Sequence, residues 1–404
     1  MVSLSNPYII IGTSAACIGA ISKLMQMQPN ARIIGISQEM EKPYNKCLLA
    51  DYAVGTKGLD DLATTRRFAN QSNIQFLLGQ RVTRIMPEHC TIELADSTIL
   101  PYQKLLLATG SSPYIPDVFK HMKSNNLFFF HTLADVNHIL NYTQKNAVTR
   151  AVIIGAGLSG LECADALQRR GITATIIEQQ AHVLPAFLSE SDAQIVHQAM
   201  QGLGIDFLSA TVAQCLYDNK GIYQLRTSAD QRIYCDLVIL ATGSRPNSDI
   251  AQSAGIECWK SSVKVTDTLQ TSHANIYAAG DLVVVKNQLT GQLCVSSTWP
   301  DAMMQGGYAA CAMAGMPKPY QGIIPMVSSA FFGLAIAIGG QMEHECKISQ
   351  KMVGSDYISL AINQNNRLRG FIFMGKTLQW TPLRRALMTQ EDISSIQDIH
   401  VYLN

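Results

Sequence analysis

The chain has 404 residues, and its 31 Lys and Arg nearly balance its 30 Asp and Glu, for a formal net charge of +1. This balance gives no basic footprint for nucleic acid or for an anionic membrane surface. Hydrophobic residues make up 47% and charged residues 15%, which excludes a disordered chain. No apolar run reaches the roughly 18 residues that a membrane span needs. The length predicts two or three domains, and ten cysteines without a CxxC pair predict reduced thiols in a cytoplasmic protein.

The N-terminal segment predicts a strand, a turn of small residues, a helix and a second strand. The apolar run 8–11 precedes the turn GTSAAC at 12–17, and an apolar strand follows the helix at 31–37. Such a turn lets backbone N–H groups approach a pyrophosphate, whose charge the helix dipole favours. Ser14 and Cys17 stand where a strict GxGxxG has glycine, so the turn by itself fits an ordinary buried strand-turn-helix equally well.

A second unit of this kind carries the full glycine pattern. A strand at 150–154 leads into GAGLSG at 155–160, a helix over 158–170 and a strand at 173–177. Glu178 ends that strand at the spacing of the acidic residue that hydrogen-bonds a ribose 2′-hydroxyl. A carboxylate repels a 2′-phosphate, and the next four residues include no Arg or Lys, so the sequence favours NADH over NADPH.

Two further segments repeat one another. The apolar strands 104–110 and 236–243 both end in Ala-Thr-Gly, and a turn that contains Pro follows each. A strand at 275–281 ends in Gly-Asp, where a carboxylate can accept hydrogen bonds from a sugar alcohol. The repetition suggests a duplicated βαβ-type domain that binds two cofactors, one that carries hydride and one that receives it.

Together these motifs resemble the FAD-dependent pyridine nucleotide oxidoreductases. The branch they resemble most contains rubredoxin reductase, the ferredoxin reductases of oxygenase systems and the flavin part of assimilatory nitrite reductases. The segments that carry the resemblance are the GxSAAG-like turn at 12–17, the PYxR-like segment 43–46, the two ATG motifs at 107–110 and 240–247, the second FAD motif at 278–281, the helix entry 299–302 with 305–306, and the C-terminal segments 333–339 and 368–370.

The resemblance implies an α/β fold with two Rossmann-like nucleotide-binding domains, one inserted in the other, and a small α+β C-terminal domain. It places a discontinuous FAD-binding domain at 1–115 and 242–320, an NADH-binding domain at 116–241 and the C-terminal domain at 321–404. We expect a C-terminal strand over 369–375 and a helix near 381–389.

The resemblance also implies roles for individual residues. Either Gln38 or Glu39, with Glu39 favoured, would meet the adenosine ribose of FAD. The other implied FAD contacts are Gly12, Ser14 and Ala15 at the pyrophosphate, Lys46, the Ala108-Thr109-Gly110 turn, Asp281 at the ribityl chain, and the Trp299-Pro300-Asp301 turn, whose N–H groups would face flavin N1 and O2. The implied NADH contacts are Gly155, Gly157, Gly160, Glu178 and the Gly243 turn.

Glu162 and Cys47 are the candidate catalytic residues. In the family, a Glu at the position of Glu162 points toward flavin N5 and often pairs with a Lys from the loop after PYxR. Here that loop is Leu48-Leu49-Ala50-Asp51, without a Lys. The alternative for Glu162 is a first-turn carboxylate favoured by the helix dipole.

Cys47 lies in the loop that would run beside the flavin. Related disulfide reductases and peroxidases use cysteines near this loop, and the adjacent Lys46 could stabilise a thiolate. The alternative is a small apolar filler. The other nine cysteines are interpreted as structural, and the nine histidines show no ligand spacing, so no metal is predicted.

Three hypotheses on function follow. The first is an FAD-dependent NAD(P)H oxidoreductase, monomeric or homodimeric, that passes hydride from NADH to flavin N5 and then electrons to a small redox protein such as rubredoxin or ferredoxin. The second is a single-cysteine disulfide or peroxide reductase that uses Cys47. The third is a catalytically idle, redox-sensing flavoprotein that binds partners.

Overall fold

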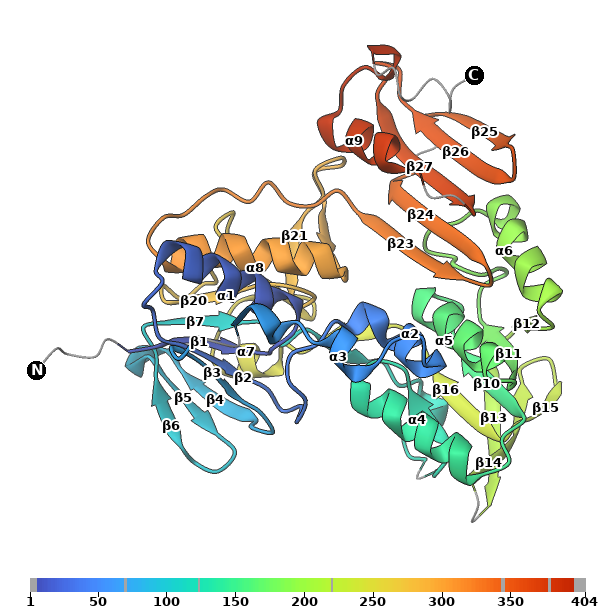
Figure 1. The fold of residues 1–404 in the computed structure, drawn as a ribbon, viewed down its shortest axis with the longest axis horizontal. Coiled ribbons are helices and arrows are strands. Elements are labelled where there is room, and N and C mark those ends of the chain that lie inside the picture. Colours follow the sequence, from blue (N-terminus) through green and yellow to red (C-terminus); the bar gives the residue numbers. More distant parts are fainter. Residues whose placement is uncertain are drawn as a thin grey trace, which may run out of the picture. The chain divides into compact units, whose positions relative to one another are not determined.

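The computed structural model describes residues 6–68, 71–122, 124–218, 221–342, 346–376 and 379–395. The chain divides into two compact units, which are interleaved along the sequence (Figure 1). The first unit contains Met1–Leu48, Lys57–Ser112 and Ser244–Ile323; the second contains Leu49–Thr56, Pro113–Gly243 and Ile324–Asn404. The predicted three-domain boundaries stay a prediction, since the C-terminal residues and the inserted segment share one unit.

A five-stranded parallel sheet forms the centre of the first unit. Its strand order is β20-β7-β1-β2-β3. The strands β1 and β2 are buried along their whole length, which explains their continuous apolar sequence. The bounds are β1 Tyr8–Ile11, β2 Ile33–Ile36, β3 Ile74–Leu77, β7 Lys104–Leu107 and β20 Ile276–Ala278.

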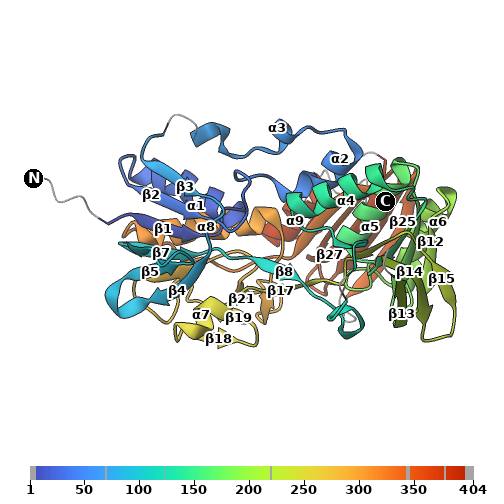
Figure 2. The ribbon, with the colours of Figure 1, turned by 90° about the horizontal axis from the view of Figure 1, so that it is seen from below.

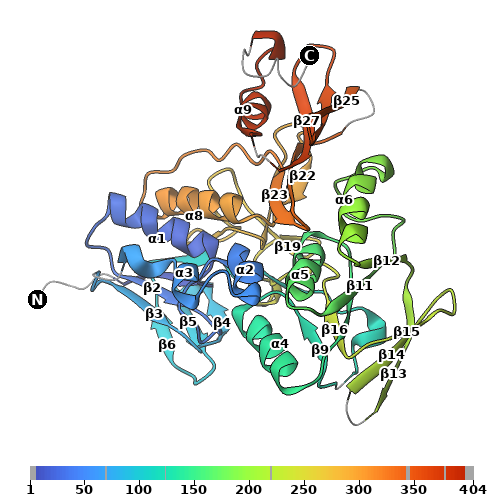
Figure 3. The same ribbon diagram turned by 45° about the vertical axis from the view of Figure 1, so that its right-hand side comes forward.

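Two helices cover one side of this sheet, α1 (Ala15–Met27) and α8 (Trp299–Met313), and an antiparallel meander lies on the other (Figures 1 and 3). The helix backbones touch, because a Cβ on Gly19 would lie 2.0 Å from the Met303 carbonyl oxygen. The meander is β4 Val82–Met86, β5 Thr91–Leu94 and β6 Ile99–Pro101; the other elements are α3 Leu59–Leu62, β8 Ser111–Pro113, β17 Ser244–Pro246, α7 Asp249–Ser253, β18 Cys258–Trp259, β19 Ser262–Lys264, β21 Val283–Lys286 and β22 Leu293–Val295.

The second unit repeats the same sheet. Its parallel strands have the order β12-β11-β10-β16-β9, so β10, β11, β12 and β16 take the places of β1, β2, β3 and β7. The predicted α/β class with two Rossmann-like units is confirmed. The bounds are β9 Leu127–Phe129, β10 Arg150–Ile154, β11 Thr173–Glu178, β12 Asp206–Ser209 and β16 Leu237–Leu240.

Alternate side chains of this sheet enter two different cores. Ile153 packs with the helices, whereas Val152 and Ile154 pack with a second meander on the opposite face (Figure 2). This alternation is the two-residue period of a strand covered on both sides. The helices are α4 Leu133–Lys145, α5 Leu158–Arg169 and α6 Glu190–Gly202, and the meander is β13 Val212–Asp218, β14 Gly221–Thr227 and β15 Arg232–Tyr234.

An antiparallel sheet of order β23-β24-β27-β26-β25 completes the second unit. Phe331 and Phe332, at the tip of the β23–β24 hairpin, enter the same core as α5. The predicted C-terminal strand and helix are confirmed as β27 (Leu368–Gly375) and α9 (Thr381–Thr389). The other strands are β23 Met326–Phe331, β24 Leu334–Gly340, β25 Lys347–Val353 and β26 Asp356–Ile362, and a short helix, α2 Leu49–Val54, also belongs to this unit.

Candidate functional site

Each unit has a glycine turn at the end of its central strand. Gly12 and Gly155 have φ angles of +103° and +107°, which favour glycine. A Cβ on Gly12 would lie 2.0 Å from the Ala108 carbonyl oxygen, and one on Gly155 would lie 2.3 Å from that of Ala241. The Ala-Thr-Gly segment therefore crosses directly against the glycine turn in both units.

The helices that follow these turns begin without a side-chain cap. Ser14 is the N-cap of α1, and its hydroxyl accepts no hydrogen bond from the described backbone; Gly157 is the N-cap of α5 and has no side chain that could accept one. In contrast, Thr132, Ser189 and Thr298 cap α4, α6 and α8. First-turn N–H groups that no side chain satisfies can bind an anion, with the helix dipole in support. Both turns therefore fit the pyrophosphate of a dinucleotide.

In the second unit, the turn itself has room for a pyrophosphate, because no described atom lies within 4 Å of a Cβ built on Gly157. Gly160 has the opposite role, since its Cβ would lie 2.1 Å from the Gly155 carbonyl oxygen. Glu178 accepts hydrogen bonds from Ala156 N at 2.9 Å and from Gln180 N at 3.0 Å. Its carboxylate is thus fixed beside the turn and retains lone pairs for a ribose hydroxyl.

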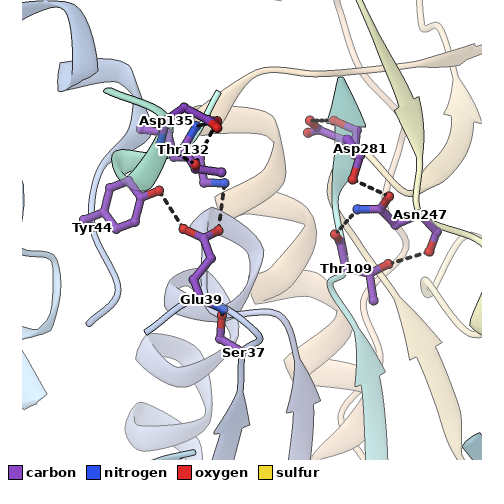
Figure 4. Close-up of polar contacts among 11 residues, drawn as sticks. Ser37, Glu39, Tyr44, Thr109, Thr132, Asp135, Asn247 and Asp281 are labelled. Carbon is purple, nitrogen blue, oxygen red and sulfur yellow. Dashed lines mark hydrogen bonds and ion pairs between the residues drawn. The ribbon is translucent and has the colours of Figure 1, made fainter. Parts of the chain in front are cut away.

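In the first unit the corresponding acidic residue, Glu39, already has side-chain partners. Tyr44 Oη donates to Glu39 Oε2 at 2.7 Å, Lys46 Nζ lies 3.1 Å from Oε1, and the Glu39 N–H donates to Ser37 Oγ at 3.0 Å (Figure 4). Gln38, the other candidate for the ribose, is exposed. The PYxR-like segment is therefore tied to the strand end through Glu39, and the FAD contacts of Lys46 and Glu39 stay predictions.

Asn247 clamps the first Ala-Thr-Gly turn, a role that sequence reasoning missed. Thr109 Oγ1 donates to Asn247 O at 2.9 Å, and Asn247 Nδ2 donates back to Thr109 O at 2.9 Å (Figure 4). Asn247 N also donates to Gly110 O. Its place at the end of the second ATG motif was the available signal. In the second unit Thr242 Oγ1 donates to Tyr114 O, and Tyr114 N to Gly243 O.

Asp281 follows β20 and is partly buried. Burial raises the pKa of its carboxyl, against the hydrogen bond from Ser111 Oγ at 3.1 Å and the charge of Lys46. The turn before it is held by the buried Gln305, whose Oε1 accepts from Gly280 N at 2.7 Å. A desolvated carboxyl with unused lone pairs fits the hydroxyls of a ribityl chain, so the donor set of the first unit fits FAD.

The start of α8 has fewer free N–H groups than the prediction for the Trp299-Pro300-Asp301 turn assumes. Pro300 has no N–H, and the Asp301 N–H donates to Thr298 Oγ1 at 3.3 Å. Asp301 Oδ2 in turn accepts from Thr298 Oγ1 and Ser296 Oγ. Of the Trp299-Pro300-Asp301 turn, only the Trp299 N–H is therefore left for the predicted donation to the flavin.

Glu162 lies partly buried in the second unit, one turn beyond the start of α5. Ser329 Oγ of β23 donates to Glu162 Oε1 at 2.5 Å. Burial raises the pKa of Glu162, the Ser329 hydrogen bond opposes this rise, and the charge of Asp51 adds to it. Among the described residues, no Lys or Arg forms an ion pair with it. The contact with Ser329 joins residues 167 positions apart, which no local sequence signal reports.

Cys47 differs from the other cysteines in exposure. Its side chain is exposed, whereas the other nine are buried or partly buried. Its N–H donates to Asn45 Oδ1 at 3.0 Å. In the described part of the chain, no cluster of three His, Cys, Asp or Glu side chains could hold a metal ion, and no helix has the length and apolar character to cross a membrane.

Residues 6–306 match the family described as pyridine nucleotide-disulphide oxidoreductase. The chain belongs to this family of oxidoreductases, which confirms the predicted family and implies FAD and NAD(P)H as cofactors. An NADH oxidase of Methanocaldococcus jannaschii is 30% identical over 341 residues, or 82% of this chain and 75% of the relative.

Two further proteins match nearly the whole chain. The 3-phenylpropionate/cinnamic acid dioxygenase ferredoxin–NAD(+) reductase component of Photorhabdus laumondii is 27% identical over 97% of this chain and 98% of the relative. The solved structure of a covalent putidaredoxin reductase–putidaredoxin complex matches with a TM-score of 0.89 at 22% identity, over 98% of this chain and 97% of that one. The last likeness concerns the fold.

Proposed function

We propose that the protein oxidises NADH and passes the electrons, through FAD bound in the first unit, to a small redox protein such as a ferredoxin or a rubredoxin. The observation that carries this proposal is the pair of uncapped helix starts, one behind each glycine turn. FAD supplies N5 as the hydride acceptor and can release electrons one at a time. The chain itself binds and orients the two nucleotides.

In the first unit, the backbone around Gly12, Ser14 and Ala15 binds the FAD pyrophosphate. Asp281 accepts hydrogen bonds from the ribityl hydroxyls, and its partial burial strengthens them because a lower local dielectric strengthens a hydrogen bond. Glu39 keeps its bonds to Tyr44 and Lys46 and offers its remaining lone pairs to the adenosine ribose.

In the second unit, the start of α5 binds the pyrophosphate of NADH and Glu178 accepts from the ribose. The preference for NADH rests on Glu178, because its carboxylate would repel a 2′-phosphate and residues 179–182 offer no cation. We expect kcat/KM for NADH to exceed that for NADPH, and Glu178→Ala to reduce the ratio at least tenfold. An unchanged ratio in this variant would remove Glu178 from the nucleotide site.

The choice of a ferredoxin as acceptor rests on the Photorhabdus laumondii relative, which is named as a ferredoxin–NAD(+) reductase component and is matched over 98% of its length. The test is an anaerobic titration of the yellow protein with NADH, followed by addition of oxidised ferredoxin or rubredoxin. We expect near-stoichiometric bleaching by NADH and rapid recovery on adding the acceptor. Bound flavin that NADH fails to bleach would instead support the redox-sensing flavoprotein that binds partners.

A second candidate is a disulfide or peroxide reductase that uses Cys47, and the exposure of this thiol alone among the ten favours it. Turnover with a disulfide or peroxide would then disappear in Cys47→Ser while bleaching by NADH remained fast. Cys258→Ser, at a partly buried cysteine of the same unit, is the matched control. Equal turnover in both variants would exclude the thiol.

A further inference from the structure

The side chain of Glu162 lies at a junction of three elements in the second unit. The helix α5 carries it, β23 supplies the Ser329 hydroxyl at 2.5 Å, and α2 packs on the same helix and contributes Asp51. A second bond joins the hairpin to this helix one turn further on, from Phe332 N to Asp165 Oδ1 at 2.8 Å. The β23–β24 hairpin is therefore fixed to α5, the helix that follows the second glycine turn.

The charged groups on the elements packed around Glu162 offer it no compensating cation. On α5 itself Arg169 lies 3.8 Å from Asp165, and the C-cap Arg170 donates to the Ala53 carbonyl oxygen of α2 at 3.1 Å. On α2 the only charged side chain is Asp51. The strand β23 has no titratable side chain. The neighbouring strands each have a charged residue at one terminus, and both residues have other partners. Arg150, the first residue of β10, lies 3.5 Å from Asp236, and Glu178, the last residue of β11, accepts from Ala156 N.

Withdrawing a carboxylate from water without a compensating cation disfavours its ionised form, so the partial burial of Glu162 raises the pKa of its carboxyl. The two neighbours act in opposite directions on this pKa. The Ser329 hydroxyl stabilises the ionised form by donating to it, whereas the negative charge of Asp51 disfavours the ionised form. Both residues therefore set the pH at which Glu162 ionises.

We propose that Ser329 is a positioning residue for the oxidation of NADH, because its hydrogen bond fixes the orientation of the Glu162 carboxyl beside the nucleotide-binding start of α5. The proposal rests on the proposed function for its kinetic part only. The protonation state of Glu162 belongs to the chain itself and is measured without turnover.

The test combines two measurements on the FAD-loaded protein and its variants. Infrared difference spectra across a pH series report the carbonyl band of a protonated carboxyl, and Glu162→Gln identifies the band by removing it. Anaerobic rapid mixing with NADH gives the bleaching rate constant at each pH. We expect both measurements to titrate with one midpoint, above the usual range of a Glu.

Variants of Ser329 and Asp51 should shift the two midpoints in opposite directions. Ser329→Ala removes a hydrogen bond to a charged acceptor, so both midpoints should rise by about one to two pH units. Ser329→Thr keeps a hydroxyl and should restore them. Asp51→Asn removes the repelling charge and should lower them. Ser328→Ala is the matched control, since Ser328 is the adjacent, exposed residue of the same strand and should move neither.

Equal infrared midpoints in Ser329→Ala and Ser328→Ala would overturn the proposal, as would a Glu162 band that titrates in the usual carboxyl range. An infrared shift without any change in the pH dependence of bleaching would overturn the positioning role. If NADH fails to bleach the flavin of the unaltered protein at any pH, the proposed function fails instead, and the infrared titration still reports on Glu162.

Discussion

The glycine turns of the two units have the same first residue and differ at the other two positions. Gly12 and Gly155 have nearly the same φ and meet the carbonyl oxygen of the crossing strand at nearly the same distance. At the third position the second unit has Gly160, whose Cβ would lie 2.1 Å from the Gly155 oxygen. The first unit has Cys17 there, fully buried.

This difference shows which contact makes a glycine necessary at each position. The first glycine is imposed by the crossing Ala-Thr-Gly strand, which both units have. The need for a third glycine depends on how closely the helix approaches the turn, and this distance can differ between the two units. In the first unit the closest backbone approach lies elsewhere, between α1 and α8, where a Cβ on Gly306 would lie 1.9 Å from Ala16 O. A motif with Ser14 and Cys17 can therefore build the same turn as a strict one.

The largest effects are expected at the first glycine. Gly12→Ala and Gly155→Ala each add a Cβ against a backbone oxygen, so we expect each to destabilise its own unit by more than about 4 kcal/mol. Gly12→Ala should lose FAD, whereas Gly155→Ala should retain FAD and lose bleaching by NADH. Flavin content after purification and NADH titration check both.

The control for these variants is Gly171→Ala. Gly171 has φ +78° just beyond α5, and no described atom lies within 4 Å of its Cβ position. Only backbone strain of about 1–2 kcal/mol is expected there, with both cofactor properties retained. Loss of FAD in Gly155→Ala but not in Gly12→Ala would reverse the assignment of the two units.

The third position should show an unequal pair of effects. Gly160→Ala forces a contact with the Gly155 oxygen and should weaken NADH binding severely. Cys17→Ala puts the same residue at the equivalent place and only removes a buried sulfur, at a cost of about 1 kcal/mol, with FAD retained. NADH titration and thermal unfolding measure the pair. Equal losses would mean that the two turns tolerate side chains alike.

The sequence predicted the parts of the site that depend on local pattern. The glycine turns, the acidic residue at the end of β11, the Ala-Thr-Gly turns and the Gly-Asp after β20 all follow from strand-turn-helix spacing. The helix α5 was predicted as 158–170 and ends at Arg169, because residues near a helix end depend on capping detail.

The contacts between distant segments could not be predicted in this way. Ser329 meets Glu162, and Asn247 meets Thr109, across more than a hundred residues. A serine in an apolar strand and an asparagine in a turn carry no sign of their partners. The sequence also could not show which N–H groups at the start of α8 are available to a flavin, since the Asp301 N–H donates to the side chain of Thr298.

The smallest effect concerns the residue just before β7 in the first unit, Gln103, and the residue just before the equivalent strand β16 in the second, Asp236. Burial would raise the pKa of Asp236, but hydrogen bonds from Thr149 N, Thr149 Oγ1 and Arg150 N together lower it. A carboxyl whose pKa is lower in the folded chain stabilises it above the unfolded pKa, and this stability is lost as pH falls through the folded pKa.

Asp236→Asn should therefore cost about 1 kcal/mol at pH 7, since the group is partly exposed, and almost nothing below its folded pKa. Hydrogen exchange at β10 and β16, compared with β1 and β7, assigns the loss to a unit. Gln103→Ala is the matched variant, and its effect should not change between pH 7 and acid. An Asp236→Asn loss that is equally large in acid would mean that the carboxylate charge has no part in joining β10 to β16.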